Sequence, residues 1–479
     1  MEKPNILWIC TDQQRFDTLG CYGNKYLRTP NLDRLTEQGV LFEQAYCQSP
    51  VCTPSRASFL AGRYPRTTRC RMNGQTVPAD EKLISKLLAD GGYTCGLAGK
   101  LHLSPCHPSV APATERRIDD GFAEFHWSHH PKPEWPTDEY QHWLRSKGKR
   151  FETTPLEGSE YVEIGMDAEN HQTTWCAEKA ICFMEANTNY DRPWMFLVDI
   201  FNPHHPFDPP RAYSERYLDI LDQVPLPAYL PGELDNKPAY QRVQQKRGSG
   251  KKGYAYSGMT EQDHKLLRTA YWAMVDLIDS QVGNMLKALE RTGQRDNTIV
   301  IFMSDHGELL GDHGMYLKGP FFYDVSIHVP LIVSMPGTVP GGHRISSFVE
   351  LVDLAPTLLE AAGLPIYRGM QGRSLWSLLT NSQNDVTHRE DVYCEYYDAS
   401  LKNRRKGAQA TMVRTHEHKL VVFHGEDIGE LYDLRQDPGE YNNKWADPAY
   451  NAVKSELLLK LCDRMAETVD PLPLRIAAW

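Results

Sequence analysis

The stretch Asn5-Ile6-Leu7-Trp8-Ile9-Cys10-Thr11-Asp12-Gln13 is an apolar run that ends in polar side chains. A short apolar run beside a turn is typical of a strand that is covered on both faces. Similar runs recur at residues 40–46, 93–98, 194–201, 298–303 and 330–334. Helical patterns alternate with them, at residues 30–38, 55–61, 81–90, 173–186 and 261–291. The alternation predicts an α/β fold with a large, mostly parallel sheet sandwiched by helices.

The pattern changes near residue 380, where a polar run is typical of a linker. Strand-like pieces and one amphipathic helix follow, at residues 391–396, 410–414, 418–423 and 448–468. We therefore expect a catalytic α/β domain over residues 1–380 and a smaller C-terminal α+β domain with an antiparallel sheet over residues 381–479. Two irregular stretches of the first domain, residues 126–165 and 225–258, are expected to form lids, rims or disordered segments.

Composition argues against several classes of partner. The 479 residues include 41% hydrophobic and 24% charged side chains, which is ordinary for a globular protein. The formal net charge of -10 argues against nucleic acid, whose phosphates need a basic surface.

No apolar window reaches the roughly 20 residues of a membrane-spanning helix. The eleven cysteines have no disulfide-type spacing, and no secretory segment is visible. These features predict a cytoplasmic chain, or a periplasmic or secreted one if a signal was removed.

Polar side chains follow two of the predicted strands. Asp12 and Gln13 come directly after the first strand, and Asp305 and His306 follow the strand at residues 298–303. Ligands of open α/β sheets bind at the carboxyl ends of the strands. Oxygen-rich groups with an imidazole suit Ca²⁺, Mg²⁺ or Mn²⁺ better than zinc. Each pair alone could be a turn or packing feature, but together they predict a cation site.

Three further segments carry candidates for catalysis. The run Val51-Cys52-Thr53-Pro54-Ser55-Arg56 places a thiol before a predicted helix, with Pro54 suited to the first helical position. Lys100 and His102 follow the strand at 93–98, and an extended backbone would place them on one face. His204 lies in the turn Pro203-His204-His205-Pro206. Taken singly, these residues are as easily a packing thiol, a solvated lysine and a loop histidine.

In type and order, the segments resemble the formylglycine-dependent (type I) sulfatases of the alkaline phosphatase superfamily. The specific part is the Cys-x-Pro-Ser-Arg signature, which Cys52 to Arg56 match. The likeness runs from Asn5 to about Gly363, and the segment 430–440 resembles a frequent ending of the family. The resemblance implies an alkaline phosphatase-like fold, in which Cys52 is oxidised to formylglycine by a formylglycine-generating enzyme. The hydrated aldehyde would then be the nucleophile.

The resemblance also assigns roles to the remaining residues. Asp12, Gln13, Asp305 and His306 would bind one divalent cation together with an oxygen of modified Cys52. Arg56 would hold the diol, and Lys100 and Lys318 would bind sulfate oxygens. His102 would take the proton that regenerates the aldehyde, and His204, preferred over His205, would bind the sulfate or protonate the leaving oxygen. Many members carry Asp where this chain has Gln13, and the missing carboxylate lowers the charge of the ligand set. Ca²⁺ is still the expected ion for a sulfatase, with Mn²⁺ or Mg²⁺ as alternatives.

The resemblance predicts a sulfatase that hydrolyses sulfate monoesters, on a small molecule or an oligosaccharide and most simply on a sulfated carbohydrate. A phosphonate monoester hydrolase or phosphodiesterase of the same superfamily is the first alternative. Lys100 and His102 favour sulfate, because the phosphonate enzymes typically lack that pair. A retired member that only binds sulfated glycans is the second alternative. Aromatic and imidazole side chains in the first irregular stretch could stack on a sugar or pack the segment: Trp127, His129, His130 and Trp135.

Overall fold

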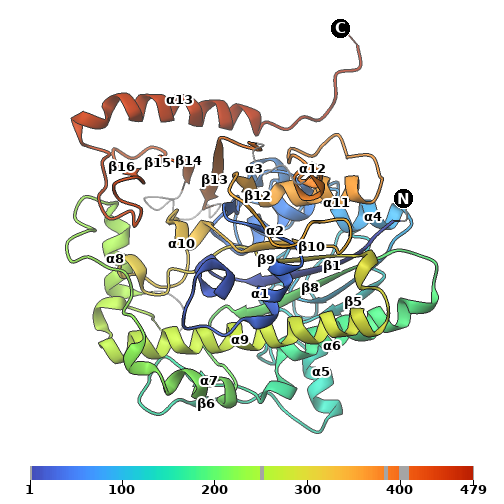
Figure 1. The fold of residues 1–479 in the computed structure, drawn as a ribbon. Coiled ribbons are helices and arrows are strands. Elements are labelled where there is room, and N and C mark those ends of the chain that lie inside the picture. Colours follow the sequence, from blue (N-terminus) through green and yellow to red (C-terminus); the bar gives the residue numbers. More distant parts are fainter. Residues whose placement is uncertain (1–2, 249–252, 382–386, 399–408, 478–479) are drawn as a thin grey trace.

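The computed structural model describes residues 3–248, 253–381, 387–398 and 409–477, and its centre is an eight-stranded sheet (Figure 1). The strand order is β11-β2-β10-β9-β1-β8-β4-β5. Their bounds are β1 (Asn5–Asp12), β2 (Val40–Phe42), β4 (Thr94–Gly99), β5 (Glu124–Trp127), β8 (Trp194–Pro203), β9 (Thr298–Ser304), β10 (Leu331–Ser334) and β11 (His343–Ile345). β10 runs antiparallel to both neighbours, and the other pairs are parallel. The predicted, mostly parallel sheet is confirmed.

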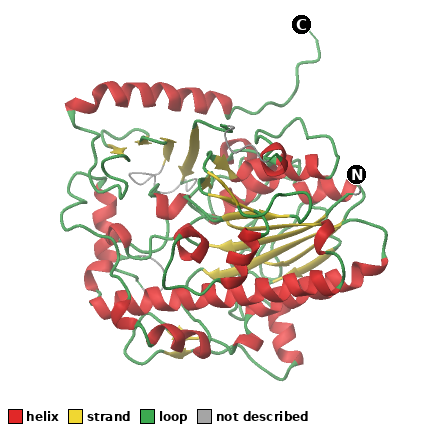
Figure 2. Ribbon diagram, in the orientation of Figure 1, coloured by secondary structure: helices red, strands yellow, loops and turns green. Residues whose placement is uncertain are grey.

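Helices cover both faces of this sheet (Figure 2). One face carries α1 (Pro30–Glu37), α5 (Glu139–Ser146), α6 (Gln172–Ala186), α7 (Arg211–Leu218) and α9 (Glu261–Arg291). The other carries α2 (Cys52–Ala61), α3 (Pro65–Thr68), α4 (Ile84–Asp90), α11 (Leu354–Ala361) and α12 (Trp376–Thr380). Side chains of β1 alternate between the two cores: Leu7 and Ile9 pack with α6 and α9, whereas Ile6 and Trp8 pack with α2 and α4. Double burial explains why the strand is apolar throughout.

Two predicted elements needed correction at their ends. The helix expected at residues 55–61 begins at Cys52, so Pro54 lies inside its first turn and Val51 is the N-cap. The strand expected at 40–46 is broken into β2 and β3 (Ala45–Tyr46). β2 pairs with β10 and β3 pairs with β12 (Val349–Glu350), so the chain changes sheets between them. By contrast, α9 has the predicted bounds.

The two irregular stretches hold more regular structure than the sequence indicated. Residues 126–165 contain the end of β5, all of α5, and the short pair β6 (Thr154–Pro155) and β7 (Glu163–Ile164). Residues 225–258 contain α8 (Ala239–Arg247), and positions 249–252 of this stretch lie outside the described residues. Within the described chain, no helix is both long and apolar enough to cross a membrane.

Asp138 at the start of α5 gives a pH-dependent contribution to stability. Its side chain accepts hydrogen bonds from the Gln141 amide and from Ser128 Oγ, and burial raises its pKa to about 7. The folded protein therefore keeps this proton after the unfolded chain has lost it near pH ~4, and stability falls as pH rises from about 4 to about 7. Asp138→Asn keeps the cap. We expect the variant to gain up to about 4 kcal/mol over the parent at pH ~8 and little at pH ~4.

Urea unfolding at both pH values measures this difference. The exposed Asp119, paired with Lys86 at the surface, supplies the control Asp119→Asn, for which we expect no such trend. An equal effect of Asp138→Asn at both pH values would contradict the buried, protonated carboxyl.

The C-terminal part forms a four-stranded antiparallel sheet in chain order, covered by one helix. Its elements are β13 (Asp391–Tyr397), β14 (Gln409–Thr415), β15 (His418–Phe423), β16 (Gly429–Asp433) and α13 (Asn451–Glu467). Figure 1 shows α13 lying across these strands. β16 was not predicted as a strand. Most of the predicted linker falls on residues 382–386, outside the described residues, and the boundary at 380 stays a prediction.

Buried charges connect this C-terminal sheet to the chain that follows Lys318. Lys419 of β15 donates to the Phe322 carbonyl over 2.9 Å and pairs with Asp324 over 2.6 Å, at the start of α10 (Asp324–Ile327). The Asp324 amide donates to Glu440 over 2.8 Å. Arg414 of β14 pairs with the same Asp324 over 3.2 Å. The C-terminal part thus holds the segment that joins β9 to β10.

Candidate active site

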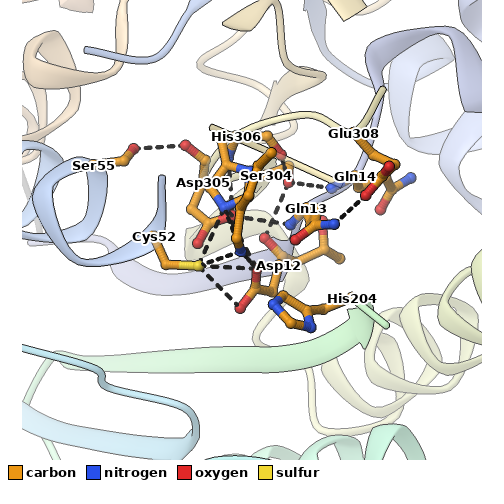
Figure 3. A network of polar contacts seen from close by, with 12 residues as sticks. Asp12, Gln13, Gln14, Cys52, Ser55, His204, Ser304, Asp305, His306 and Glu308 are labelled. Carbon is orange, nitrogen blue, oxygen red and sulfur yellow. Dashed lines mark hydrogen bonds and ion pairs between the residues drawn. The ribbon is translucent and has the colours of Figure 1, made fainter. Parts of the chain in front are cut away.

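The carboxyl ends of β1 and β9 are joined by hydrogen bonds, as the sequence predicted for two neighbouring parallel strands (Figure 3). Thr11 is paired with Ser304, and the Asp305 amide donates to the Thr11 carbonyl over 3.1 Å. The Asp305 carboxylate in turn accepts from the amides of Gln13 and His306, over 3.0 and 2.9 Å. These bonds bring Asp12, Gln13, Asp305 and His306 to one point.

The buried residues at that point form a group that could hold a cation. One candidate ligand atom from each of Asp12, Cys52, Asp305 and His306 lies within 4.8 Å of the others. Gln13 has a left-handed φ of 66°, and its Nε2 donates to Glu308. Its Oε1 is buried and has no hydrogen-bond partner among the described residues. A free amide oxygen beside two carboxylates and an imidazole fits a hard divalent ion such as Ca²⁺, Mg²⁺ or Mn²⁺.

Cys52 begins α2 with its sulfur directed at this group. The Sγ atom lies 2.7 Å from Lys318 Nζ, 3.2 Å from His306 Nε2 and 3.8 Å from Lys100 Nζ. Burial and the Asp12 carboxylate raise the pKa of the Cys52 thiol, but the surrounding cations outweigh them and lower its pKa overall. The position therefore stabilises negative charge, which is typical of a reactive group.

Arg56 lies one turn along α2, and its guanidinium is fully buried among carboxylates. Nε donates to Asp305 over 2.9 Å, and Nη1 donates to Asp199 over 2.7 Å. Nη2 is 3.8 Å from Asp12 and has no hydrogen-bond partner among the described residues. Its hydrogen bonds reach the acids around Cys52 and not the sulfur itself. Asp199, an acidic residue inside the apolar run of β8, was missed, although a lone carboxylate in a buried strand was a usable signal.

Lys100 and His102 follow β4 (Thr94–Gly99), whose last residue, Gly99, passes close to the backbone of Asp199 in β8. Gly99 has φ of 112°, and a Cβ there would lie 1.9 Å from the Asp199 carbonyl oxygen. Only glycine fits this approach. Lys100 Nζ then pairs with Asp12 and points at Cys52. His102 has φ of 55°, and its buried Nδ1 has no partner among the described residues.

A cavity of about 410 Å³ opens above these residues. Its wall includes Cys52, Asn73, Lys100, His102, His129, His130, Lys132, Glu134, His204, His205 and Tyr254. Residues 129–134 and Tyr254 belong to the two irregular stretches, which were expected to form lids, rims or disordered segments. Both stretches contribute to the wall of the cavity, as expected of a rim. Asn73, Glu134 and Tyr254 were not singled out from the sequence, because isolated polar residues in loops carry no motif.

Both histidines of the 203–206 turn line this cavity. His204 Nδ1 lies 2.6 Å from the His205 carbonyl oxygen and therefore donates to it, which leaves Nε2 free. The two rings are stacked with centroids 4.1 Å apart. Burial, and then the charge of Lys318, lowers the pKa of both rings, to about 3 for His205. Figure 3 places the His204 ring beside Asp12.

Comparisons with known families agree with this geometry. The family model described as "Sulfatase" matches residues 4–364, about three quarters of the chain. A second model, "N-sulphoglucosamine sulphohydrolase, C-terminal", matches residues 311–467 and therefore spans the predicted boundary at 380.

Individual relatives cover nearly the whole chain. An arylsulfatase of Clostridium perfringens is 29% identical over 92% of this chain and 90% of its own. An N-acetylglucosamine-6-O-sulfatase of Bacteroides thetaiotaomicron is 27% identical over 98% of this chain and 87% of its own. Among solved structures, a phosphonate monoester hydrolase of Agrobacterium radiobacter superimposes with a TM-score of 0.85, at 28% identity, over 98% of this chain and 97% of that one.

Proposed function

Since the chain belongs to the sulfatase family and is a sulfuric ester hydrolase, we propose that it cleaves the sulfate monoester of a sulfated carbohydrate with a nucleophile made from Cys52. The observation that carries the proposal is the set of cations around a single buried atom. Lys318 and Lys100 lie 2.7 and 3.8 Å from Cys52 Sγ, at the floor of an open cavity. A sulfate group bound there would meet preorganised positive charge.

The nucleophile in this proposal is formylglycine, produced from Cys52 by a formylglycine-generating enzyme. The sulfur atom marks where the oxygens of the hydrated aldehyde would lie. When formed, this group would supply one hydroxyl that attacks sulfur and displaces the sugar alcohol, and a second whose deprotonation expels sulfate and restores the aldehyde. The same contacts that lower the pKa of the Cys52 thiol would stabilise an oxyanion at this place.

Asp12, Gln13, Asp305 and His306 would hold the divalent cation, with an oxygen of modified Cys52 completing the set. Ca²⁺ is our choice because the donors are mostly oxygen and the orphaned Gln13 Oε1 needs a cationic partner. The bound ion would polarise the nucleophile and neutralise sulfate charge. Arg56 would orient Asp12 and Asp305 as ligands, through its 3.8 and 2.9 Å contacts.

His102 and His204 would move the protons. Burial, and then Lys100, lowers the pKa of His102 well below its usual value, so its neutral ring suits a proton acceptor. His204 keeps Nδ1 bonded to the His205 carbonyl and presents Nε2 to the substrate. Its pKa is also held low by burial and Lys318. An anionic sulfate beside Lys318 would raise it again, so that His204 gains a proton as the substrate binds.

The substrate class is supported by the cavity and by the relatives. A volume of about 410 Å³ fits a ligand of sugar size, and its polar wall of histidines, Lys132, Glu134 and Asn73 offers many hydrogen bonds. The N-acetylglucosamine-6-O-sulfatase relative acts, by its name, on a sulfated amino sugar. We therefore place a sulfated sugar in the cavity, with its ester toward Cys52.

A phosphonate monoester hydrolase or phosphodiesterase is the alternative, because the Agrobacterium structure superimposes well at 28% identity. Lys100 argues against it. It is a buried ammonium paired with Asp12 and close to Cys52, and it forms with His102 the pair that the phosphonate enzymes typically lack.

Kinetics on matched aryl sulfate and aryl phosphonate monoesters test the proposal. We expect kcat/KM to favour the sulfate, and Lys100→Ala to reduce kcat/KM for the sulfate by about 10²- to 10³-fold, as when one preorganised charge is removed from a transition state. Lys132→Ala, at the rim of the same cavity, is the matched control and should change mainly KM. A higher kcat/KM for the phosphonate would favour the alternative. Absence of turnover on a broad panel of sulfated glycans by fully modified protein would support a retired, glycan-binding member instead.

A further inference from the structure

A second cluster of metal-binding side chains lies on the wall of the cavity. One candidate ligand atom from each of His102, Cys106 and His129 lies within 4.8 Å of the other two. Its donors are two imidazoles and a thiol, whereas the group around Asp12 is mostly carboxylate and amide oxygen. The two clusters therefore suit different ions: nitrogen and sulfur prefer zinc and similar ions, while oxygen prefers calcium or magnesium.

His102 and Cys106 are buried, His129 is partly exposed, and each histidine ring has a nitrogen atom without a partner in the described parts of the chain. The rings of His102 and His129 meet edge to face, with centroids 4.6 Å apart and planes at 72°. The Nδ1 atoms of both rings are inaccessible to solvent and have no hydrogen-bond partner among the described residues. His102 is 8% exposed and Cys106 is 7% exposed. An unpaired, buried imidazole nitrogen is costly unless a ligand completes it.

A shell of fixed contacts holds the cluster in place. The Glu115 carboxylate accepts from the His102 amide over 2.8 Å and from Trp127 Nε1 over 2.9 Å. Cys106 Sγ lies 3.6 Å from the same carboxylate and 3.2 Å from the Ser104 carbonyl, and so donates its hydrogen within this loop. Trp127 and Trp135 pack against Cys106 as an apolar wall. Such supporting contacts orient ligands before an ion arrives.

We propose that His102, Cys106 and His129 form a binding site for Zn²⁺ or a similar thiophilic divalent ion, separate from the cation site at Asp12. Binding would form two metal–nitrogen bonds and one metal–sulfur bond and release the thiol proton to solvent, with water in the fourth position. The ion reaches the site through the cavity, because His102 and His129 line it.

The ion would also regulate the enzyme. If His102 takes a proton during turnover, as the proposed function holds, then a metal bound to His102 removes that acceptor and stops turnover. This regulatory part rests on the proposed function, whereas the binding site does not. The hard ion at Asp12 would support catalysis and the soft ion at Cys106 would block it.

Titration with CoCl₂, monitored by absorbance, tests the site directly. The protein is first converted at Cys52 and kept in excess Ca²⁺, so that neither the Cys52 thiol nor an empty Asp12 site can bind cobalt. We expect one equivalent of Co²⁺ to produce a thiolate-to-metal charge-transfer band and ligand-field bands of a tetrahedral centre. Addition of ZnCl₂ should bleach both.

Two variants and one control decide the result. Cys106→Ser should lose the charge-transfer band, and His129→Gln should weaken Co²⁺ binding by about 10-fold or more. Cys182→Ser removes an exposed thiol elsewhere and should bind Co²⁺ like the parent. A band that survives in Cys106→Ser, or that disappears in Cys182→Ser, would overturn the site. If Cys106→Ser does not fold, His129→Gln alone decides the outcome.

Activity distinguishes the site from the proposed function. In buffer that has been freed of transition metals and supplied with Ca²⁺, sulfate release tests the proposed function alone. Stoichiometric ZnCl₂ should then inhibit the parent and Cys182→Ser, while Cys106→Ser keeps its turnover. Lack of sulfate release before zinc is added would refute the proposed function and leave the cobalt result standing. Equal zinc inhibition of parent and Cys106→Ser would overturn the regulatory inference.

Discussion

Cys52→Ala is expected to abolish sulfate release, with a loss of about 10⁴-fold or more in kcat, because the variant has neither a thiol to modify nor any group to attack. The fold should survive. Within the described part of the chain the Cys52 sulfur hydrogen-bonds to side chains and to no backbone group, and alanine fits the first turn of α2 at least as well. Removing the side chain leaves Lys318 and Lys100 facing one another with one group fewer between them, so anions such as sulfate should still bind.

Three measurements support this test. Peptide mass analysis of the parent should show the thiol at residue 52 replaced by an aldehyde. The same peptide from Cys52→Ala should be unchanged by co-expression with a formylglycine-generating enzyme. Cys47→Ala is the matched control, because it removes a buried thiol five residues away that does not line the cavity. Full activity of Cys52→Ala, or an unmodified thiol in fully active parent protein, would refute the nucleophile.

Arg56→Met is expected to destabilise the folded protein by about 3–5 kcal/mol, because it removes the shared partner of three buried acids. Asp12, Asp199 and Asp305 lie within 3.8, 2.7 and 2.9 Å of the guanidinium. Methionine replaces the apolar stem of arginine but not its guanidinium, so the acids repel one another in a site of low dielectric. Affinity for Ca²⁺ should fall as well, because Asp12 and Asp305 lose their orientation.

A double variant separates charge from packing. Of the three acids, Asp199 is the one that is not a proposed metal ligand, and Asp199→Asn removes its charge. The double variant Arg56→Met with Asp199→Asn should therefore recover part of the stability that Arg56→Met loses. Urea unfolding gives the free energies, and calorimetry gives the Ca²⁺ affinity. Arg69→Met serves as the control, since Arg69 and Asp80 form an exposed pair that contributes at most about 1 kcal/mol. Additive losses in the double variant would show that the acids do not depend on Arg56.

The sequence predicted the sheet because its strands are buried on both faces, and burial of that kind leaves an uninterrupted apolar run. The site was predictable where polar residues directly follow such runs, as at Asp12, Asp305 and His204, or where a motif is specific, as at Cys52 to Arg56. Residues that act through contacts distant in sequence were not predictable. Asp199 meets Arg56 across 143 positions, and the partner of Gln13 is Glu308, 295 positions away.

The start of α2 and the short strands β5 and β16 were not predicted correctly, for a different reason. α2 begins at Cys52, and the Thr53 amide of its first turn donates to Asn73 Oδ1, 20 positions away, whereas local preference favours a start at Pro54. β16 and β5 are short and partly polar, and they exist because a longer neighbouring strand offers them hydrogen bonds. Tertiary pairing decides such elements.

The hydrogen bonds between β15 and the segment after Lys318 have a consequence for a shortened chain. Lys419 holds the Phe322 carbonyl and Asp324, and Glu440 holds the Asp324 amide, so the loop that carries Lys318 is anchored from the C-terminal sheet. The residues around Lys318 are therefore held from two parts of the chain: the Leu317 amide donates to Glu308 within the α/β part, and residues 322–324 are held from the C-terminal part. Although every proposed residue of the site precedes residue 380, a chain cut there would lose the second of these two anchors.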